Sequence, residues 1–325
     1  MMQDDLTDCP SGVWVELDVT PDVKYGGKYS AQSFADDLNT VTIWVFDQNG
    51  SYIDKYTSTG EVLKMNNNTM NLPIGAGKYR IVVWTGAGDI NYEMSDMKAG
   101  VSTIDDLKVR VARDQNNRQG KKLSSLWHGI EDVEVKESEY VYLPVKLTKD
   151  TNTIITVLHD TSGNSLDSDD YVFEIVSDNG YMDYKNQLLS DAQITYDAYL
   201  VETALLSDGD VSGGTGETKL SVARAELNTL RLMADKNTRF IVRNKEAGRK
   251  ILDINLTEYL LLTREFYTGS NGKTMSPQAY LDYEDLFRII FFLVPNPNPT
   301  EDSPVYLCTQ LSINGWIVRI NNAEF

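Results

Sequence analysis

The segment 40–53 constrains the fold more than any other part of this chain, because it reads as two strands joined by a tight turn. Its side chains alternate between two faces of an extended chain, and both faces carry large apolar residues. One face holds Val41, Ile43 and Val45, and the other holds Thr42, Trp44 and Phe46. Asn49 and Gly50 then supply residues that tolerate positive φ. A strand that is apolar on both sides belongs inside a layered β-structure, so the segment predicts an all-β protein.

The remainder of the first half repeats this pattern of short strands and turns. The corner 72–79 is compact, because Pro73 ends strand pairing and Gly75 and Gly77 permit a sharp bend. Short strands separated by turn signals are typical of a β-sandwich. The strands expected in this half are 13–19, 40–46, 52–55, 71–74, 79–85, 107–111, 133–135 and 140–147.

The second half opens with the apolar run 153–158 and is also rich in strands. Two short helices are expected, at 256–264 and 277–286, the second with Ser276 as its cap and Pro277 at its first position. Asn314 and Gly315 lie between two apolar runs, which is the strongest hairpin signal in the chain. The further strands expected are 170–176, 194–200, 220–233, 238–243, 250–254, 288–293, 307–313 and 316–320.

The boundary between the two halves is expected near Asp150, which gives an N-terminal sandwich at 1–149 and a C-terminal sandwich at 150–325. The junction is short, so the two units are expected to contact each other. A length of 325 residues is sufficient for two domains of ordinary size.

The composition restricts the classes of partner. The formal net charge of −18 disfavours binding to nucleic acid and adsorption to anionic lipid, because both would repel the surface. No window of about 18 apolar residues exists that would span a membrane. The two cysteines, Cys9 and Cys308, are too few for a disulfide framework or a zinc site and are expected to be separate thiols.

No motif predicts catalysis. The only histidines, His128 and His159, have no neighbouring nucleophile or metal partners at a known spacing, and a packed His128 is the favoured interpretation. The motifs of serine hydrolases, nucleotide-binding loops, zinc proteases and dinucleotide-binding folds are missing from the sequence. We therefore predict no catalytic residue, no cofactor-binding residue and no metal ligand.

Two groups of features leave alternatives open. The acidic segments 47–50, 167–170 and 208–210 resemble calcium loops, although solvated loop acids are the favoured interpretation. The five tryptophans and eighteen tyrosines could line a sugar site, although most tryptophans are expected in the core. We expect Trp44, Phe46, Tyr79 and Val83 to be core residues of the first sandwich.

Several segments, spread in one order over nearly the whole chain, together resemble a known family. They include Asp8-Cys9-Pro10, Val45-Phe46-Asp47-x-Asn49-Gly50, Gly77-x-Tyr79 leading to Val83-Trp84, Leu126-Trp127-His128-Gly129, Leu147-x-Lys149-Asp150-x-Asn152, Thr257-Glu-Tyr259-Leu260, Tyr280-Leu-Asp282-x-Glu284-Asp285, Ile290-Phe291-Phe292-Leu293 and Ile313-Asn314-Gly315-Trp316-x-Val318-Arg319. The set resembles the FimB-like family of Bacteroidales fimbrial anchor and assembly subunits. The corner at 72–79 is similar to that of transthyretin-like sandwiches.

The resemblance implies two tandem transthyretin-like sandwiches and a non-enzymatic subunit that anchors a fimbrial shaft or regulates its assembly. It implies partners among shaft or accessory subunits, joined by donor-strand exchange, and no nucleic acid. It also implies an exported lipoprotein at the outer membrane, held by a lipidated cysteine upstream of this sequence. Cys9 does not fit that role, because it precedes Pro10 and no apolar signal comes before it.

The sequence leaves two other functions open, a carbohydrate-binding surface lipoprotein and a hydrolase. The scarcity of histidine and the terminal hairpin favour the fimbrial interpretation. About five residues follow the last expected strand, which is marginal for a donor strand. The chain is therefore expected to accept a partner's strand at an open sheet edge, or to end a fibre.

Overall fold

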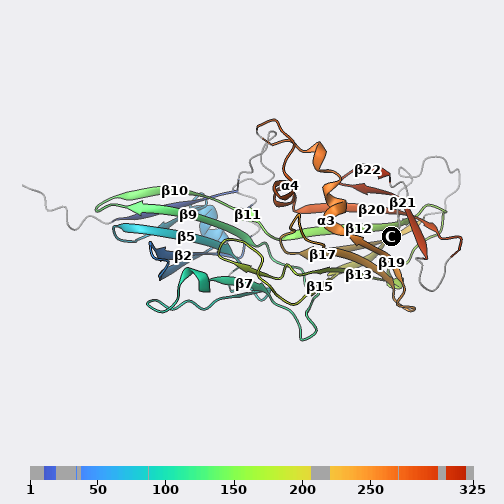
Figure 1. Cartoon of the computed structure of the whole chain (residues 1–325), viewed down its shortest axis with the longest axis horizontal. Helices are drawn as coiled ribbons and strands as arrows, with labels where there is room; N and C mark the ends of the chain where they lie inside the picture. The colour runs from blue at the N-terminus through green and yellow to red at the C-terminus, as the bar shows by residue number, and fades with distance from the viewer. Residues whose placement is uncertain are drawn as a thin grey trace, which may run out of the picture.

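The computed structural model describes residues 11–19, 34, 38–86, 88–205, 220–269, 271–298 and 305–319. Most of these residues lie in strands, which form several sheets with a few short helices, so the all-β prediction is confirmed. The molecule is elongated, and the sheets of the first half of the chain lie at one end of its long axis (Figure 1). No helix in the described ranges is long and apolar enough to cross a membrane.

The first half contributes two sheets that pack face to face. A three-stranded sheet has the order β10 (Tyr140–Lys146), β1 (Gly12–Asp18) and β4 (Thr69–Leu72). A five-stranded sheet has the order β11 (Thr148–Lys149), β9 (Trp127–Val135), β5 (Gly77–Thr85), β2 (Thr40–Asp47) and β3 (Tyr52–Thr59). Helix α2 (Gly60–Met65) connects β3 to β4.

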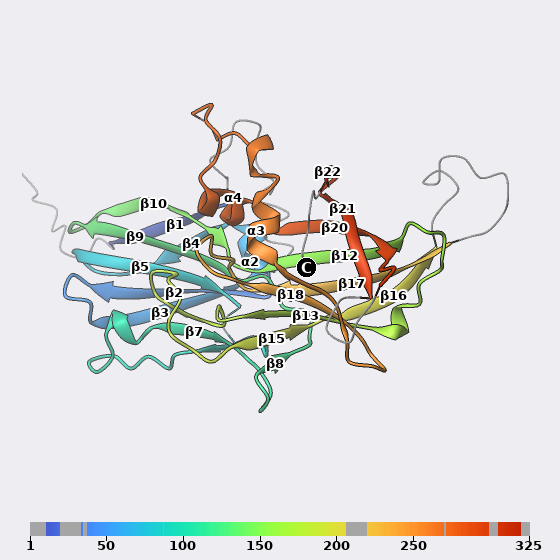
Figure 2. The ribbon, with the colours of Figure 1, turned by 45° about the vertical axis from the view of Figure 1, so that its right-hand side comes forward.

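The second half contributes two larger sheets. The six-stranded sheet has the order β16 (Leu200–Leu205), β17 (Ser221–Thr229), β12 (Asn152–Asp160), β20 (Leu286–Pro295), β21 (Tyr306–Ile313) and β22 (Trp316–Arg319). The other sheet has the order β19 (Lys250–Asn255), β18 (Arg239–Asn244), β13 (Tyr171–Ser177), β15 (Ile194–Asp197) and β8 (Arg118–Gln119). Helices α3 (Leu256–Leu261) and α4 (Pro277–Tyr283) lie together on one side of the molecule (Figure 2).

Part of the chain between β5 and β9 pairs with strands of the second half. Strand β7 (Lys108–Val111) lies between β6 (Tyr92–Met94) and β14 (Tyr181–Asp183) in a small three-stranded sheet. Strand β8 pairs in parallel with β15. Backbone hydrogen bonds therefore join the two halves at places far from Asp150 in sequence.

The five-stranded sheet of the first half is buried on both faces. The residues Val41, Ile43 and Val45 of β2 pack in a core shared with β1, β4 and β10. On the opposite face, Trp44 and Phe46 join a larger core that continues through β7 into the sheets of the second half. The alternation in the sequence is thus confirmed, and it places this sheet as the middle layer of three.

Burial of the expected core residues is confirmed with one exception, although Trp44 and Phe46 lie in the larger core that continues into the second half. Trp44, Phe46 and Val83 are buried. Tyr79 is wrong as a core residue, because it is only half-buried and its hydroxyl donates a hydrogen bond to the Gly75 carbonyl oxygen at 3.1 Å. Tyr79 lies near the start of β5, which begins at Gly77, next to the corner. Its ring packs against the edge of the core, and its hydroxyl group stays near the surface.

The helices near the end of the chain begin where their caps predict. The Ser276 hydroxyl accepts a hydrogen bond from the Ala279 amide at 3.2 Å and opens α4 at Pro277. Both helices are shorter than predicted: α3 ends at Leu261 and is followed by a 3-10 turn, η4 (Arg264–Phe266), and α4 ends at Tyr283, before β20 begins at Leu286. Strand β9 begins at Trp127, six residues before the strand expected from the sequence.

Replacing Trp44 by alanine should destabilise the protein by about 3–5 kcal/mol, because the indole fills the larger core and its removal leaves a cavity. The free energy of unfolding measured in denaturant tests this. The matched control is Trp14→Ala, which removes an exposed indole and should cost about 1 kcal/mol or less. Equal losses in the two variants would contradict the assignment of Trp44 to the core.

Candidate functional site

His128 and Cys308 are both buried. His128 is buried, its Nε2 lies 2.8 Å from the Tyr184 carbonyl oxygen, and burial lowers its pKa to about 4. Its ring contacts Trp84, with 4.5 Å between the ring centroids, so the packed histidine predicted from the sequence is confirmed. Burial also raises the pKa of the Cys308 thiol to about 11. Among the described residues, no group of three or more His, Cys, Asp or Glu side chains could hold a metal ion.

The acidic segments singled out in the sequence form turns. The Asp47 carboxylate accepts hydrogen bonds from the amides of Asn49 and Ser51, each at 2.8 Å, which closes the turn between β2 and β3. Those backbone hydrogen bonds, chiefly the one from Ser51, lower the pKa of Asp47. Asp167 accepts from the Asp169 amide at 3.0 Å and caps the 3-10 turn η3 (Ser168–Asp170). The segment 208–210, like Cys9, lies outside the described residues.

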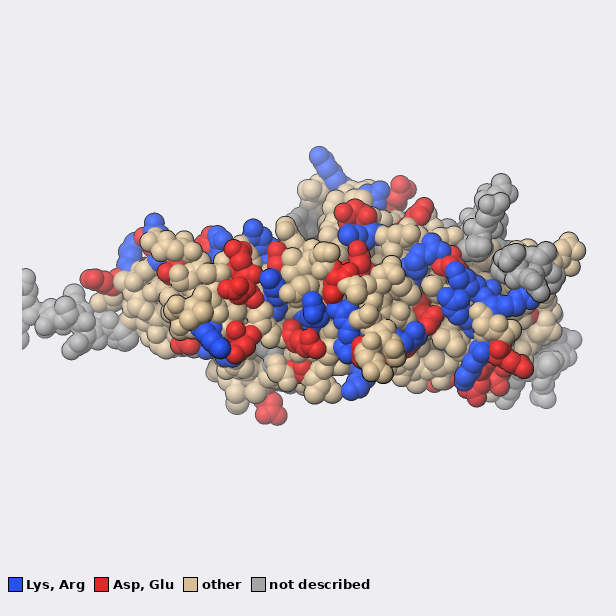
Figure 3. All heavy atoms as spheres, turned by 60° about the horizontal axis from the view of Figure 1, so that its bottom comes forward, with Lys and Arg blue, Asp and Glu red and all other residues tan. Residues whose placement is uncertain are grey.

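The outer face of the β19-β18-β13-β15-β8 sheet carries interlocked ion pairs. Arg118 binds both Asp197 and Glu174, and Arg243 binds Glu174 at 3.3 Å. Asp253 on the edge strand β19 binds Arg239 and Lys250, each at 2.5 Å. Figure 3, in which the bottom of Figure 1 comes forward, shows acidic and basic side chains intermixed over this side. Because these charged side chains pair with one another, this face offers little apolar surface to a partner.

Most sheet edges in the described part of the chain are protected against pairing with another strand. Strands β6, β8, β11 and β14 have two or three residues each, β10 contains Pro144, and β3 exposes Asp54 and Lys55. On the six-stranded sheet, the 3-10 turn η3 lies against β16, where the Ser168 amide donates to the Thr203 hydroxyl at 2.9 Å. Strand β22, at the opposite edge of that sheet, is four residues long, contains no proline and is apolar from Trp316 to Val318.

An exposed apolar surface adjoins β22. It consists of Phe266, Trp316 and Ile317, which we call the β22 surface, and all three side chains are exposed. Trp316 is 44% exposed although it stacks on Phe266, with 3.9 Å between the ring centroids and 5° between the planes. Large exposed apolar groups beside an open sheet edge indicate a protein-binding surface.

Local structure fixes both rings of the β22 surface. Asn314 and Gly315 adopt φ values of 50° and 85°, which turn β21 into β22 and place Trp316 at the start of the edge strand. The Asn314 side chain accepts from the Arg288 amide at 2.8 Å and donates to Glu284 at 2.9 Å, so the turn is attached to β20 and α4.

The segment that carries Phe266 is also held in place. The buried Thr263 hydroxyl lies 2.8 Å from the Tyr280 hydroxyl, which ties the end of α3 to α4. The sequence identified the hairpin at Asn314 but not Phe266, because no local pattern shows that residues fifty positions apart stack on each other.

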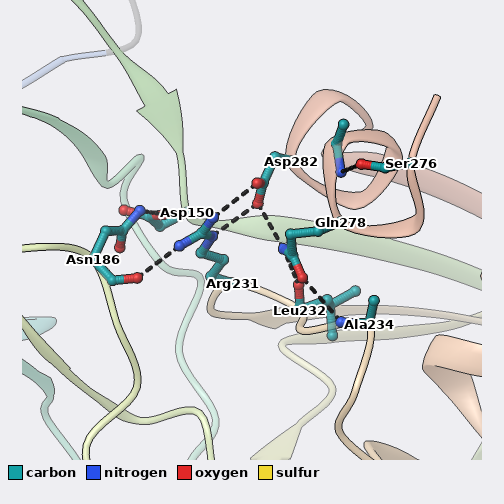
Figure 4. A network of polar contacts seen from close by, with 9 residues as sticks. Asp150, Asn186, Arg231, Leu232, Ala234, Ser276, Gln278 and Asp282 are labelled. Atoms are coloured by element: carbon teal, nitrogen blue, oxygen red, sulfur yellow. Dashed lines mark hydrogen bonds and ion pairs between the residues drawn. The ribbon is translucent and has the colours of Figure 1, made fainter.

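A polar network, buried at Asp150 and Asn186 and partly exposed at Arg231, lies at the junction of the two halves (Figure 4). The Arg231 guanidinium binds Asp282 of α4 through two hydrogen bonds of 2.8 Å, and it donates to the Asn186 carbonyl oxygen at 2.6 Å. The Asn186 amide nitrogen in turn donates to Asp150 at 2.7 Å. Gln278 donates to Asp282 at 2.9 Å and extends the network along α4. The network therefore connects the junction, the loop after β14, the end of β17 and α4.

Asp150 is the buried carboxyl group of this network. It is completely buried, and one of its carboxylate oxygens has no hydrogen-bond partner among the described residues. Burial raises the pKa of Asp150 to about 7, against the opposing effects of Arg231 and of the hydrogen bond from Asn186. A carboxyl group with this pKa is largely protonated in mildly acidic solution and largely ionised in alkaline solution.

Comparison with protein families identifies the chain. Residues 6–322 match the family model of the fimbrillin-A associated anchor proteins Mfa1 and Mfa2. The chain belongs to this family. It is thus a fimbrial protein of the cell surface, of the anchor and assembly type. The family resemblance inferred from the sequence is confirmed. Comparison with curated proteins found no significant match.

Solved structures of similar proteins share the architecture over their whole length. A proposed adhesin of Bacteroides thetaiotaomicron is 31% identical, with 98% of this chain and 100% of that chain covered and a TM-score of 0.78. A proposed polysaccharide-binding protein of the same organism is 29% identical, with 96% and 98% covered and a TM-score of 0.77. The fimbrial anchor protein Mfa2 of Porphyromonas gingivalis has the same fold, at 21% identity, 96% and 99% coverage and a TM-score of 0.68.

Replacing Asp150 by asparagine should change how stability depends on pH. The folded-state pKa lies above the unfolded value of 3.8, so the folded wild type holds more protons between about pH 4 and pH 7 and loses stability as pH rises. Relative to the Asp150→Asn variant, the free energy of unfolding of the wild type should fall by on the order of 1 kcal/mol for each pH unit of increase in this range.

Unfolding free energies from pH 4 to pH 8 provide the measurement. The matched control is the Asp105→Asn variant, which changes an exposed carboxylate of the first half. The difference in unfolding free energy between this control and the wild type should be the same at each pH. If the difference between Asp150→Asn and the wild type stays constant over this range, Asp150 is not a buried titrating group.

Proposed function

We propose that this protein anchors a fimbrial shaft to the cell, or ends it, by accepting an extended strand of a neighbouring subunit at β22. The observation that supports the proposal most is the β22 surface, where three exposed apolar side chains lie on or beside an edge strand. The family supports a role in the fimbrium, and the similar Porphyromonas structure is that of a fimbrial anchor. The strand contact itself is our inference from the geometry of the edge.

The geometry suits addition of a strand. Main-chain groups on the outer side of an edge strand give affinity to an added strand, and pockets for alternate side chains give specificity. Ile317 lies opposite Ser312 of β21, and Trp316 lies opposite Ile313. Neighbouring residues of a strand point to opposite faces, so an added strand would contact Trp316 and Phe266 on one face and Ile317 on the other.

A subunit that links a fibre to a cell must carry tension along its length, and the junction suits this purpose. The proposed units, 1–149 and 150–325, share the larger core and are joined by the pairings β7–β14 and β8–β15. The Arg231–Asp282 pair ties α4 to the same junction. The two units should therefore move as one body rather than swing about a linker.

The remaining parts of the proposal follow the family. The protein is exported as a lipoprotein and held at the outer membrane by a lipidated cysteine that precedes this sequence. Its partners are shaft or accessory fimbrial subunits, and it carries out no catalysis. Loss of labelled lipid from the natural protein after replacement of that cysteine is the outcome expected, and lipid that persists in the variant would contradict this part.

The double variant Phe266→Ala/Trp316→Ala should bind the shaft subunit of its own fimbria roughly 30-fold more weakly, because it removes the stacked pair at the centre of the β22 surface. Calorimetric titration of the two purified proteins measures the dissociation constant. Circular dichroism and melting should show an intact fold, since both side chains are substantially exposed.

Trp14→Ala is the matched control, because it removes an exposed indole of the first half and should leave this affinity unchanged. Tight binding of the double variant would place the partner elsewhere. Normal attachment of fimbriae in a strain that lacks the gene would refute the anchor function altogether.

A further inference from the structure

A second aromatic surface lies at the other end of the molecule, on the outer face of the β10-β1-β4 sheet. Trp14 of β1 is 43% exposed, and Tyr140 and Tyr142 of β10 are 40% and 59% exposed. The residues that alternate with Trp14, Val13 and Val15, are buried in the core beneath. Packing of the inner face explains why β1 is a strand. It does not explain why three aromatic rings lie on the outer face of the sheet.

The sheet holds these rings in a row. Tyr140 lies opposite Gly12 in the parallel pairing of β1 with β10, and Tyr142 lies opposite Trp14. A Cβ atom on Gly12 would come within 2.7 Å of the Tyr140 ring, so the ring lies across the bare backbone of β1. The centroids of the Trp14 and Tyr140 rings are 6.1 Å apart. The absence of a side chain at Gly12 thus lets Tyr140 extend the aromatic surface of Trp14.

Polar groups fix the other end of the row. The Tyr142 hydroxyl hydrogen-bonds the Glu16 carboxylate on β1, and this bond raises the pKa of Tyr142. On the other side of β1, Asn71 of β4 is exposed and lies opposite Trp14. From Gly12 to Glu16 the strand rises about 13 Å, so the rings form a narrow strip with an amide and a carboxylate beside it.

We propose that the strip formed by Tyr140, Trp14 and Tyr142 binds a neutral oligosaccharide. Flat, exposed aromatic rings suit the apolar C–H faces of sugar rings, while Asn71 and Glu16 can hydrogen-bond the hydroxyl groups at their rims. The length of the strip suits a short linear chain rather than a single sugar. The Glu16 carboxylate supports the choice, because an anionic glycan would place its own carboxylates beside it, whereas Asp18, further along β1, lies opposite Lys146 of β10.

This inference is independent of the proposed function, because the strip and the β22 surface belong to different sheets, which lie toward opposite ends of the molecule (Figure 1). A fimbrial protein with both surfaces would attach to other subunits through one and to glycans through the other. The two can fail separately: loss of Trp316 should affect only subunit binding, and loss of Trp14 only glycan binding.

Titration of the intact protein with cellohexaose, mannohexaose and maltohexaose tests the proposal. An oligogalacturonate serves as the anionic comparison. At least one neutral oligosaccharide should bind and change the intrinsic tryptophan fluorescence, since Trp14 is exposed. Trp14→Ala and Tyr142→Ala should each weaken that binding about tenfold or more, and Tyr142→Phe should weaken it less. Phe266→Ala/Trp316→Ala should bind the oligosaccharide as the wild type does.

The proposal is overturned if none of the neutral oligosaccharides binds at millimolar concentration, or if Trp14→Ala and Tyr142→Ala bind as the wild type does. It is also overturned if the fluorescence responds only to phosphatidylcholine vesicles, because the rings would then contact lipid. Preference for the oligogalacturonate would contradict the charge argument and the assignment of a neutral ligand.

Discussion

Burial of one sheet on both faces is the constraint on which the rest of the structure depends. The β11-β9-β5-β2-β3 sheet packs against β1, β4 and β10 on one side and contributes Trp44, Phe46 and Trp84 to the larger core on the other. Because that larger core continues into the second half, the two halves cannot separate without exposing it to water. The elongated molecule is therefore a single body, with its distinctive surfaces at positions fixed by the sheets.

The sequence predicts the middle layer well, because a strand buried on both faces has an unmistakable apolar pattern from Val41 to Phe46. It also predicts the α4 cap at Ser276 and the turn at Asn314, where local side-chain chemistry determines the backbone. These features depend on residues close together in sequence. The family could likewise be inferred, since the ordered segments that carry it cover nearly the whole chain.

What the sequence does not predict depends on contacts between distant residues. Strands β7 and β8 are short, and their partners β14 and β15 lie about 75 residues away in the chain. The stack of Phe266 on Trp316, and the passage of Tyr140 over Gly12, likewise arise only when the sheets assemble. Trp14 and Trp316 are exposed, unlike the other three tryptophans, because each lies on the outer side of its sheet or at its edge.

The central claim is that a partner's strand pairs with β22. Hydrogen–deuterium exchange of the protein, alone and bound to the neighbouring shaft subunit, tests it most directly, because an added strand would satisfy the outer main-chain groups of Trp316–Arg319. Exchange at these amides should be slower in the complex, with little change in β10, β1 and β4. Unchanged exchange at β22, with new protection at another sheet edge, would contradict it.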